Sequence, residues 1–84
     1  MRLRRFWFEF QGLDIPLGYT LGCGVTAFDE GDAVDLIRQR IGRLPEIERI
    51  IADVDVSTLD AGHVLPNMLP PVWRGVWFPS GPLA

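Results

Sequence analysis

The sequence predicts a small α+β domain with a four-stranded, mainly antiparallel sheet and one helix on one face. Apolar residues alternate with a period of two in four segments, one segment between them has helical spacing with caps at both ends, and the order is ββαββ. A right-handed crossover from the second strand through the helix to the third strand places the first strand between them. The predicted strand order is therefore 2-1-3-4.

The first two strands are expected at residues 3–10 and 19–27. One face of the first strand carries Phe6, Phe8 and Phe10, and this face is expected to meet the helix. Trp7 lies on its other face. In the second strand, bulky residues alternate with the nearly bare positions Gly22 and Gly24. Because glycine in a strand often marks a close approach by another group, we expect a neighbouring aromatic side chain to lie over these two positions.

The helix is expected to begin after Asp29 and to run to about Ile41. Asp29 is a favourable N-cap residue, and an apolar stripe with helical spacing follows it. Gly42 is the expected C-terminal capping residue, and Pro45 prevents the helix from continuing.

The third and fourth strands are expected at residues 47–56 and 72–78, joined by a long connection over residues 57–71 that starts with a turn capped by Ser57. In the third strand, one face carries Ile50, Ala52, Val54 and Val56. In the fourth strand, the inward residues are Val72, Val76 and Phe78 if Trp73 and Trp77 point outward. The domain is thus expected to span residues 1–79, and residues 80–84 form a flexible tail.

The sheet face opposite the helix is the predicted interaction surface. The single predicted helix is roughly 20 Å long and lies on the other face of the sheet. The face opposite the helix is apolar and has no predicted cover, so it needs one. The candidate interface residues are Trp7, Ile51, Trp73 and Trp77 on the sheet, with Asp29, Asp32 and Asp35 as an acidic edge. Three covers remain open: the connection over residues 57–71 folded back as a second small core, a second copy of the chain, or another protein.

No metal site is expected. Oxygen-bearing side chains alternate at Asp53, Asp55, Ser57 and Asp60, as at the start of a calcium loop. The run lacks the glycine at the sixth position and the bidentate glutamate at the twelfth, so it indicates strand and turn structure.

No catalytic residues and no cofactor are expected either. Cys23, His63 and Asp60 could form a nucleophile, base and orienting group, but Cys23 falls on the predicted core face, where a thiol is normally inert. The glycines before the helix lack the spacing of a phosphate loop. An enzyme or metal-binding protein that uses His63, Asp60 and Cys23 is therefore the least favoured class.

Composition and charge favour a protein partner. The chain has 84 residues and a net charge of −3, and its three-arginine cluster Arg2, Arg4 and Arg5 indicates a solvated strand edge rather than a nucleic-acid site. A single cysteine and no long apolar stretch indicate a cytoplasmic protein that does not act at membranes. The sequence thus predicts a non-catalytic interaction module, such as an inhibitor, a bacterial immunity-type binder or an accessory subunit. The alternative is a homodimer joined through the same face.

Overall fold

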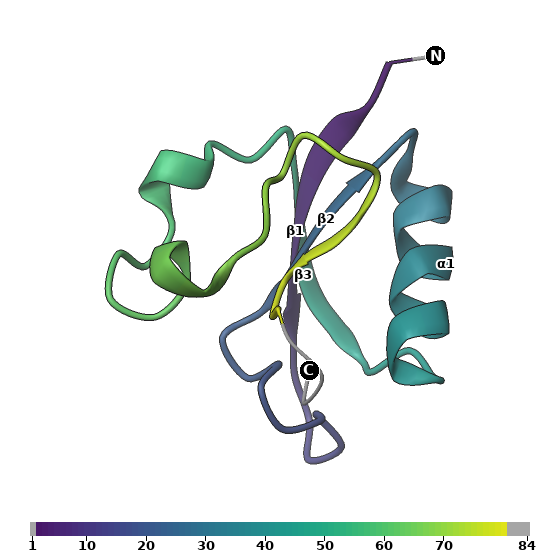
Figure 1. The fold of residues 1–84 in the computed structure, drawn as a ribbon. Coiled ribbons are helices and arrows are strands. Elements are labelled where there is room, and N and C mark those ends of the chain that lie inside the picture. Colours follow the sequence, from purple (N-terminus) through teal and green to yellow (C-terminus); the bar gives the residue numbers. More distant parts are fainter. Residues whose placement is uncertain (1, 81–84) are drawn as a thin grey trace.

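Within residues 2–80, four strands and one α-helix form the fold, and the helix packs on one face of the sheet (Figure 1). The computed structural model describes residues 2–80. The elements are β1 (Arg4–Phe10), β2 (Cys23–Ala27), α1 (Glu30–Ile41), β3 (Ile47–Ala52) and β4 (Gly75–Phe78), with the two 3₁₀ turns Val56–Thr58 and Leu65–Asn67 between β3 and β4. All neighbouring strands are antiparallel. The predicted α+β class and the ββαββ layout are confirmed.

The larger of two apolar cores lies between α1 and the sheet. Phe6 of β1 lies opposite Val25 of β2, and both side chains are buried under the helix residues Ala33 and Ile37. The prediction that the phenylalanine face of β1 meets the helix is therefore confirmed. This core fixes the sheet against α1 and leaves the other sheet face to the rest of the chain.

The helix α1 begins and ends at the predicted residues. The Asp29 carboxylate accepts a hydrogen bond of 2.8 Å from the backbone N–H of Asp32, which satisfies one free donor of the first turn. Gly42 adopts a φ of 91° and donates its N–H to the Arg38 carbonyl oxygen over 2.7 Å. Glycine is favoured here because a side chain disfavours this left-handed conformation.

The strand β4 occupies a different edge of the sheet from the predicted one. The observed order is β3-β1-β2-β4, so β4 pairs with β2. The predicted order 2-1-3-4 required it to pair with β3 instead. The chain between β3 and β4 passes over the sheet face opposite α1 and reaches the free edge of β2 (Figure 1). A connection this long does not force consecutive strands to be neighbours, unlike a short hairpin loop.

The strand β3 ends at Ala52, earlier than the predicted end at Val56. Asp53 adopts a φ of 54°, which is incompatible with a continuing strand. The resulting turn changes the face on which the chain lies. Ile50 packs in the core under α1, whereas Val54 and Val56 pack on the opposite face. The prediction that these three residues share one face is therefore wrong.

The strand β4 is also shorter than predicted, since it begins at Gly75 and not at Val72. Its ladder partners are Gly24 for Phe78 and Val25 for Val76. The register therefore skips Trp77, and a bulge of this kind changes the direction of the side chains around it. Trp77 and Phe78 are both buried on the face away from α1. The predicted alternation, with Phe78 inward and Trp77 outward, is corrected.

A second core lies between the sheet and the connection from β3 to β4. It buries Trp7, which is 3% exposed, and Trp77, which is 1% exposed, with their ring centroids 6.0 Å apart. The connection supplies the buried Val54 and Val64 and the partly buried Val56, Leu59 and Met68. The sequence allowed three covers for this sheet face: the connection, a second copy of the chain or another protein. For Trp7 and Trp77, the structure shows that the connection is the cover.

The aromatic cover expected over the two bare glycines is confirmed. A Cβ atom built on Gly22 would lie 2.5 Å from Cζ2 of Trp7, and one on Gly24 would overlap the six-membered ring of Trp77. The glycines thus leave the space in which the two indoles lie.

None of the helices within residues 2–80 has the length and apolar character needed to cross a membrane. Residues 81–84, which belong to the predicted flexible tail, lie outside the described residues.

Candidate functional site

The structure separates the predicted interface residues into buried and exposed groups. Trp7 and Trp77 lie inside the second core, and Ile51 packs against them. The two indoles are buried and therefore not available to a partner, whereas Ile51 is partly buried. Trp73 is 71% exposed. Of the three tryptophans in the predicted interface, it is therefore the one that a partner can contact.

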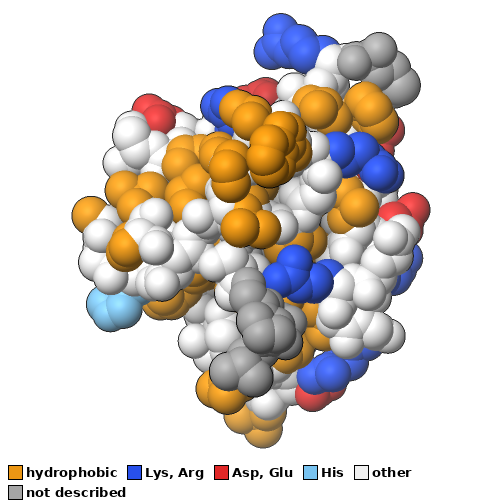
Figure 2. All heavy atoms as spheres, in the orientation of Figure 1, with side chains coloured by type: hydrophobic (Ala, Val, Ile, Leu, Met, Phe, Trp, Pro, Cys, Tyr) orange, Lys and Arg blue, Asp and Glu red, His pale blue; other side chains and the backbone are white. Residues whose placement is uncertain are grey.

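An apolar surface surrounds Trp73. We call it the Trp73 surface, and it consists of the exposed residues Leu69, Val72 and Trp73. Figure 2 shows hydrophobic side chains gathered on this face, in the region where Figure 1 places this part of the chain. Contiguous exposed apolar residues of this kind often mark a contact site.

Two side-chain contacts hold the Trp73 surface in place. The buried Thr26 hydroxyl donates a 2.5 Å hydrogen bond to the carbonyl oxygen of Pro71. On the other side of Trp73, Arg74 donates to both carboxylate oxygens of Asp32, with Nε to Oδ2 at 2.9 Å. Trp73 is therefore presented by a segment that is fixed on both sides, which reduces the conformational entropy lost when a partner binds.

The three aspartates of the predicted acidic edge already have partners within the chain. Asp29 caps α1, Asp32 is paired with Arg74, and Oδ1 of Asp35 lies 3.7 Å from Nη1 of Arg38. The edge thus presents less unpaired negative charge than the sequence suggests. In the structure, Asp32 anchors the segment that carries the exposed tryptophan.

The pKa of Asp32 provides a test of this anchor. Hydrogen bonds from the Arg74 side chain and from the Phe28 backbone N–H lower it from 3.8 to about 2. We expect Arg74→Met to raise the pKa of Asp32 toward 3.8, as measured by NMR titration of the carboxyl carbon. Because the folded-state pKa lies below the unfolded one, the pair stabilises the fold fully above about pH 4, and this contribution is lost as the pH falls through about 2.

The matched control for this titration is Arg38→Met, which removes the partner of Asp35 instead. It should leave the pKa of Asp32 unchanged. An unchanged pKa of Asp32 in the Arg74 variant contradicts the proposed anchor.

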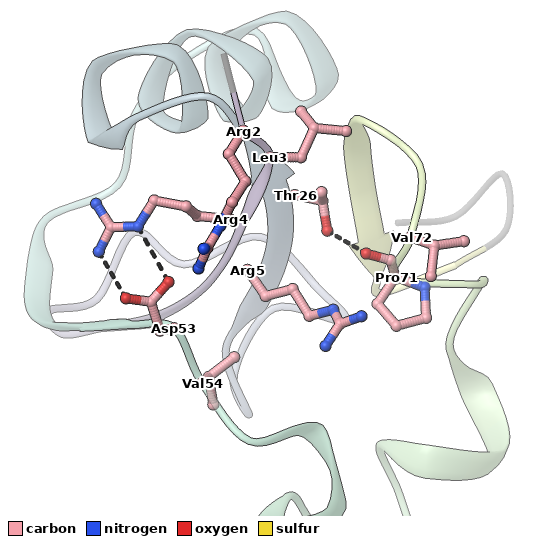
Figure 3. A pocket seen from close by; sticks show the side chains of 9 residues that line it. All are labelled: Arg2, Leu3, Arg4, Arg5, Thr26, Asp53, Val54, Pro71 and Val72. Carbon is pink, nitrogen blue, oxygen red and sulfur yellow. Dashed lines mark hydrogen bonds and ion pairs between the residues drawn. The ribbon is translucent and has the colours of Figure 1, made fainter.

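A cavity of about 360 Å³ opens beside the Trp73 surface (Figure 3). Its floor includes Arg5 of β1 and Thr26 of β2, which lie opposite each other in the ladder on the face away from α1. Its walls come from three separate segments, residues 2–4, 53–54 and 71–72. The fold therefore brings the start of the chain, the end of β3 and the Trp73 surface together around one hollow.

The cavity has a positively charged lining. Arg4 is paired with Asp53, with Nε 3.0 Å from Oδ1 and Nη2 2.8 Å from Oδ2. This hydrogen bonding lowers the pKa of Asp53, and the charges of Arg4 and Arg2 lower it further. Within residues 2–80, the side chains of Arg2 and Arg5 make no ion pair or hydrogen bond. Two guanidinium groups therefore remain available at the cavity.

The carboxylates of the calcium-like run point to separate partners. Asp53 is held by arginine, as described above. Asp55 accepts from the backbone N–H of Ser57 at 3.0 Å and caps the 3₁₀ turn Val56–Thr58. Asp60 accepts backbone hydrogen bonds in the next turn. The capping residue is thus Asp55, whereas the sequence predicted Ser57. Within residues 2–80, no group of three side chains that could bind a metal occurs.

The structure does not bring Cys23 to the other two residues of the considered triad. Nδ1 of His63 lies 3.2 Å from Oδ2 of Asp60 on the exposed connection. Cys23 is buried in the core under α1, on the other side of the sheet, and this burial raises the pKa of its thiol to about 12. At neutral pH this cysteine is therefore a protonated core residue.

Sequence reasoning alone does not find the cavity. The cluster Arg2, Arg4 and Arg5 signals a basic strand end, but the sequence does not show that Asp53 neutralises Arg4 and leaves the other two arginines unpaired. The sequence also does not show that residues 71–72 lie near the start of β1. Their position there depends on the pairing of β4 with the edge of β2.

Comparisons of the chain with protein-family models, with curated proteins and with solved structures found no match. Its function is therefore inferred from the site itself.

Proposed function

We propose that this protein is a small non-catalytic interaction module that binds another protein through the Trp73 surface. The observation that carries the proposal is Trp73, a residue that is 71% exposed on a segment anchored by Thr26 and Asp32. Tryptophan is among the residues that most often dominate binding energy at protein interfaces. A binder that inhibits a larger protein and an accessory subunit of an assembly both fit this description.

We also propose that the protein acts in the cytoplasm. Its single cysteine is a buried free thiol, and the fold is held together by two apolar cores rather than by a disulfide. This construction suits a reducing compartment.

Site-specific photocrosslinking tests the proposed surface. A benzoylphenylalanine in place of Val72 should form a covalent adduct with the partner in cells of the organism that encodes the protein. Val72 is exposed and adjacent to Trp73, so the probe reaches any molecule that covers the indole. Adding Trp73→Ala to the same chain should abolish the adduct, and mass spectrometry identifies its components.

The control carries the same probe at Gln39, an exposed position of α1. This position should give no adduct that depends on Trp73. An adduct of two 9.5 kDa chains at position 72 assigns the surface to the alternative function, a homodimer. The absence of any adduct that requires Trp73 contradicts an interaction through this surface.

A further inference from the structure

We propose that the cavity beside the Trp73 surface binds an acidic side chain of the partner, while a nearby apolar side chain of the same partner segment packs on Trp73. This inference rests on the proposed function and adds the chemistry of the partner segment. Its physical basis is a pair of arginines, Arg2 and Arg5, that have no ion-pair or hydrogen-bond partner within residues 2–80 and lie next to an exposed apolar surface.

The charge of the cavity selects an anion. Three arginines and one aspartate line it, and the ion pair between Arg4 and Asp53 leaves the guanidinium groups of Arg2 and Arg5 without a described partner. In Figure 3, the Arg5 side chain extends toward Pro71, beneath the hydrogen bond from Thr26. A carboxylate in the cavity can therefore receive planar guanidinium donors, which is the strong, charge-assisted type of hydrogen bond.

The apolar part of the lining selects a peptide over a bare anion. Leu3, Val54 and Val72 contribute to the walls, and Trp73 directly follows Val72 in the chain. A cavity of about 360 Å³ lies at the small end of the range for ligand pockets, roughly 300–1,000 Å³. An acidic side chain inside and an apolar side chain on the adjoining surface fit this combination.

Nucleic acid fits the same surface less well. Binding to a phosphate backbone depends on many Lys and Arg contacts, whereas this cavity offers two arginines without a partner among the described residues, on a chain whose net charge is −3. The exposed indole next to the cavity is also apolar enough to anchor a protein segment. An acidic and apolar peptide is therefore the occupant to test.

The probe is a short peptide of alternating glutamate and leucine with blocked ends, titrated into the ¹⁵N-labelled full chain and followed by NMR. The signals of the Arg5 side-chain Nε–H and of the Trp73 indole should shift, while those of the buried Trp7 and Trp77 indoles should stay in place. Arg5→Gln should weaken binding at least about tenfold, because a hydrogen bond to a charged group is lost. Arg5→Lys, which keeps the charge, should weaken it less.

The matched control is Arg38→Gln, which makes the same change in net charge at an exposed position of α1. It should change the affinity less than about twofold, since a distant surface charge is largely screened. A peptide with glutamine in place of glutamate should bind to the unmodified protein at least about tenfold more weakly. The retained amide spectrum of each variant shows that it is folded.

Four results overturn the inference. The first is equal peptide affinity of the Arg5→Gln and Arg38→Gln variants. The second is tighter, Arg5-dependent binding of an oligothymidine, which assigns the cavity to nucleic acid. The third is a shift of the Trp73 indole signal with protein concentration alone, which assigns the surface to a second copy of the chain. The fourth is an absence of peptide binding. If it is found together with an adduct at position 72 that requires Trp73, the proposed function stays intact and only this inference is removed.

Discussion

Trp77→Ala is expected to lower the free energy of unfolding by about 3–5 kcal/mol, the usual cost of removing a large aromatic side chain from a core. Trp77 is buried against Trp7 and holds the connection from β3 to β4 on the sheet. The deletion leaves a cavity between two parts of the chain that are distant in sequence, so we expect little relaxation around it. Urea unfolding followed by circular dichroism measures the change.

The neighbouring tryptophan of the same segment is the control. Trp73→Ala should change the free energy of unfolding by less than about 0.5 kcal/mol, because the ring lies mostly in water. Similar losses for the two variants contradict the division into one buried anchor and one exposed residue. Trp77→Phe should be intermediate, since it keeps part of the buried apolar volume and removes an indole N–H that has no hydrogen-bond partner among the described residues.

Features of the fold that depend on local signals can be predicted from the sequence. The helix begins after Asp29 and ends before Gly42, because capping depends on side chains and dihedral angles within one turn. The alternation of phenylalanines in β1 correctly identifies the face that meets α1. The bare positions Gly22 and Gly24 correctly indicate aromatic cover, although not which indole covers which glycine.

Features that depend on contacts between distant segments could not be predicted. The alternation in residues 72–78 suggests a regular strand, but the bulge at Trp77 is set by the pairing of β4 with β2. Whether a tryptophan is buried therefore depends on which edge β4 occupies. The same difference applies to the candidate site. Trp73 belongs to the predicted surface, whereas the cavity beside the Trp73 surface is formed by three segments that only the tertiary fold brings together.

Gly22→Ala is expected to lower the free energy of unfolding by about 2–5 kcal/mol, through backbone strain combined with overpacking. Gly22 has a φ of 133°, which side chains rarely allow, and the new Cβ would lie 2.5 Å from Cζ2 of Trp7 and 2.8 Å from the backbone carbonyl oxygen of Phe8. The indole is packed within the second core and the carbonyl belongs to β1, so neither can move away easily. Chemical denaturation measures the loss.

Two companion variants separate the strain from the overlap. Gly42→Ala places a Cβ on another residue with positive φ, 91°, but with no atom within 4 Å, and it should cost about 1 kcal/mol from backbone strain alone. In a Trp7→Phe background, where the ring over Gly22 is smaller, Gly22→Ala should cost at least about 1 kcal/mol less than in the unmodified protein. If the cost of Gly22→Ala equals that of Gly42→Ala and does not depend on residue 7, the bare position does not serve to admit the indole. If Gly22→Ala lowers the free energy of unfolding less in the Trp7→Phe background, the absence of a side chain at position 22 serves to admit the indole of the second core. That core holds the connection from β3 to β4 in place and so positions the Trp73 surface.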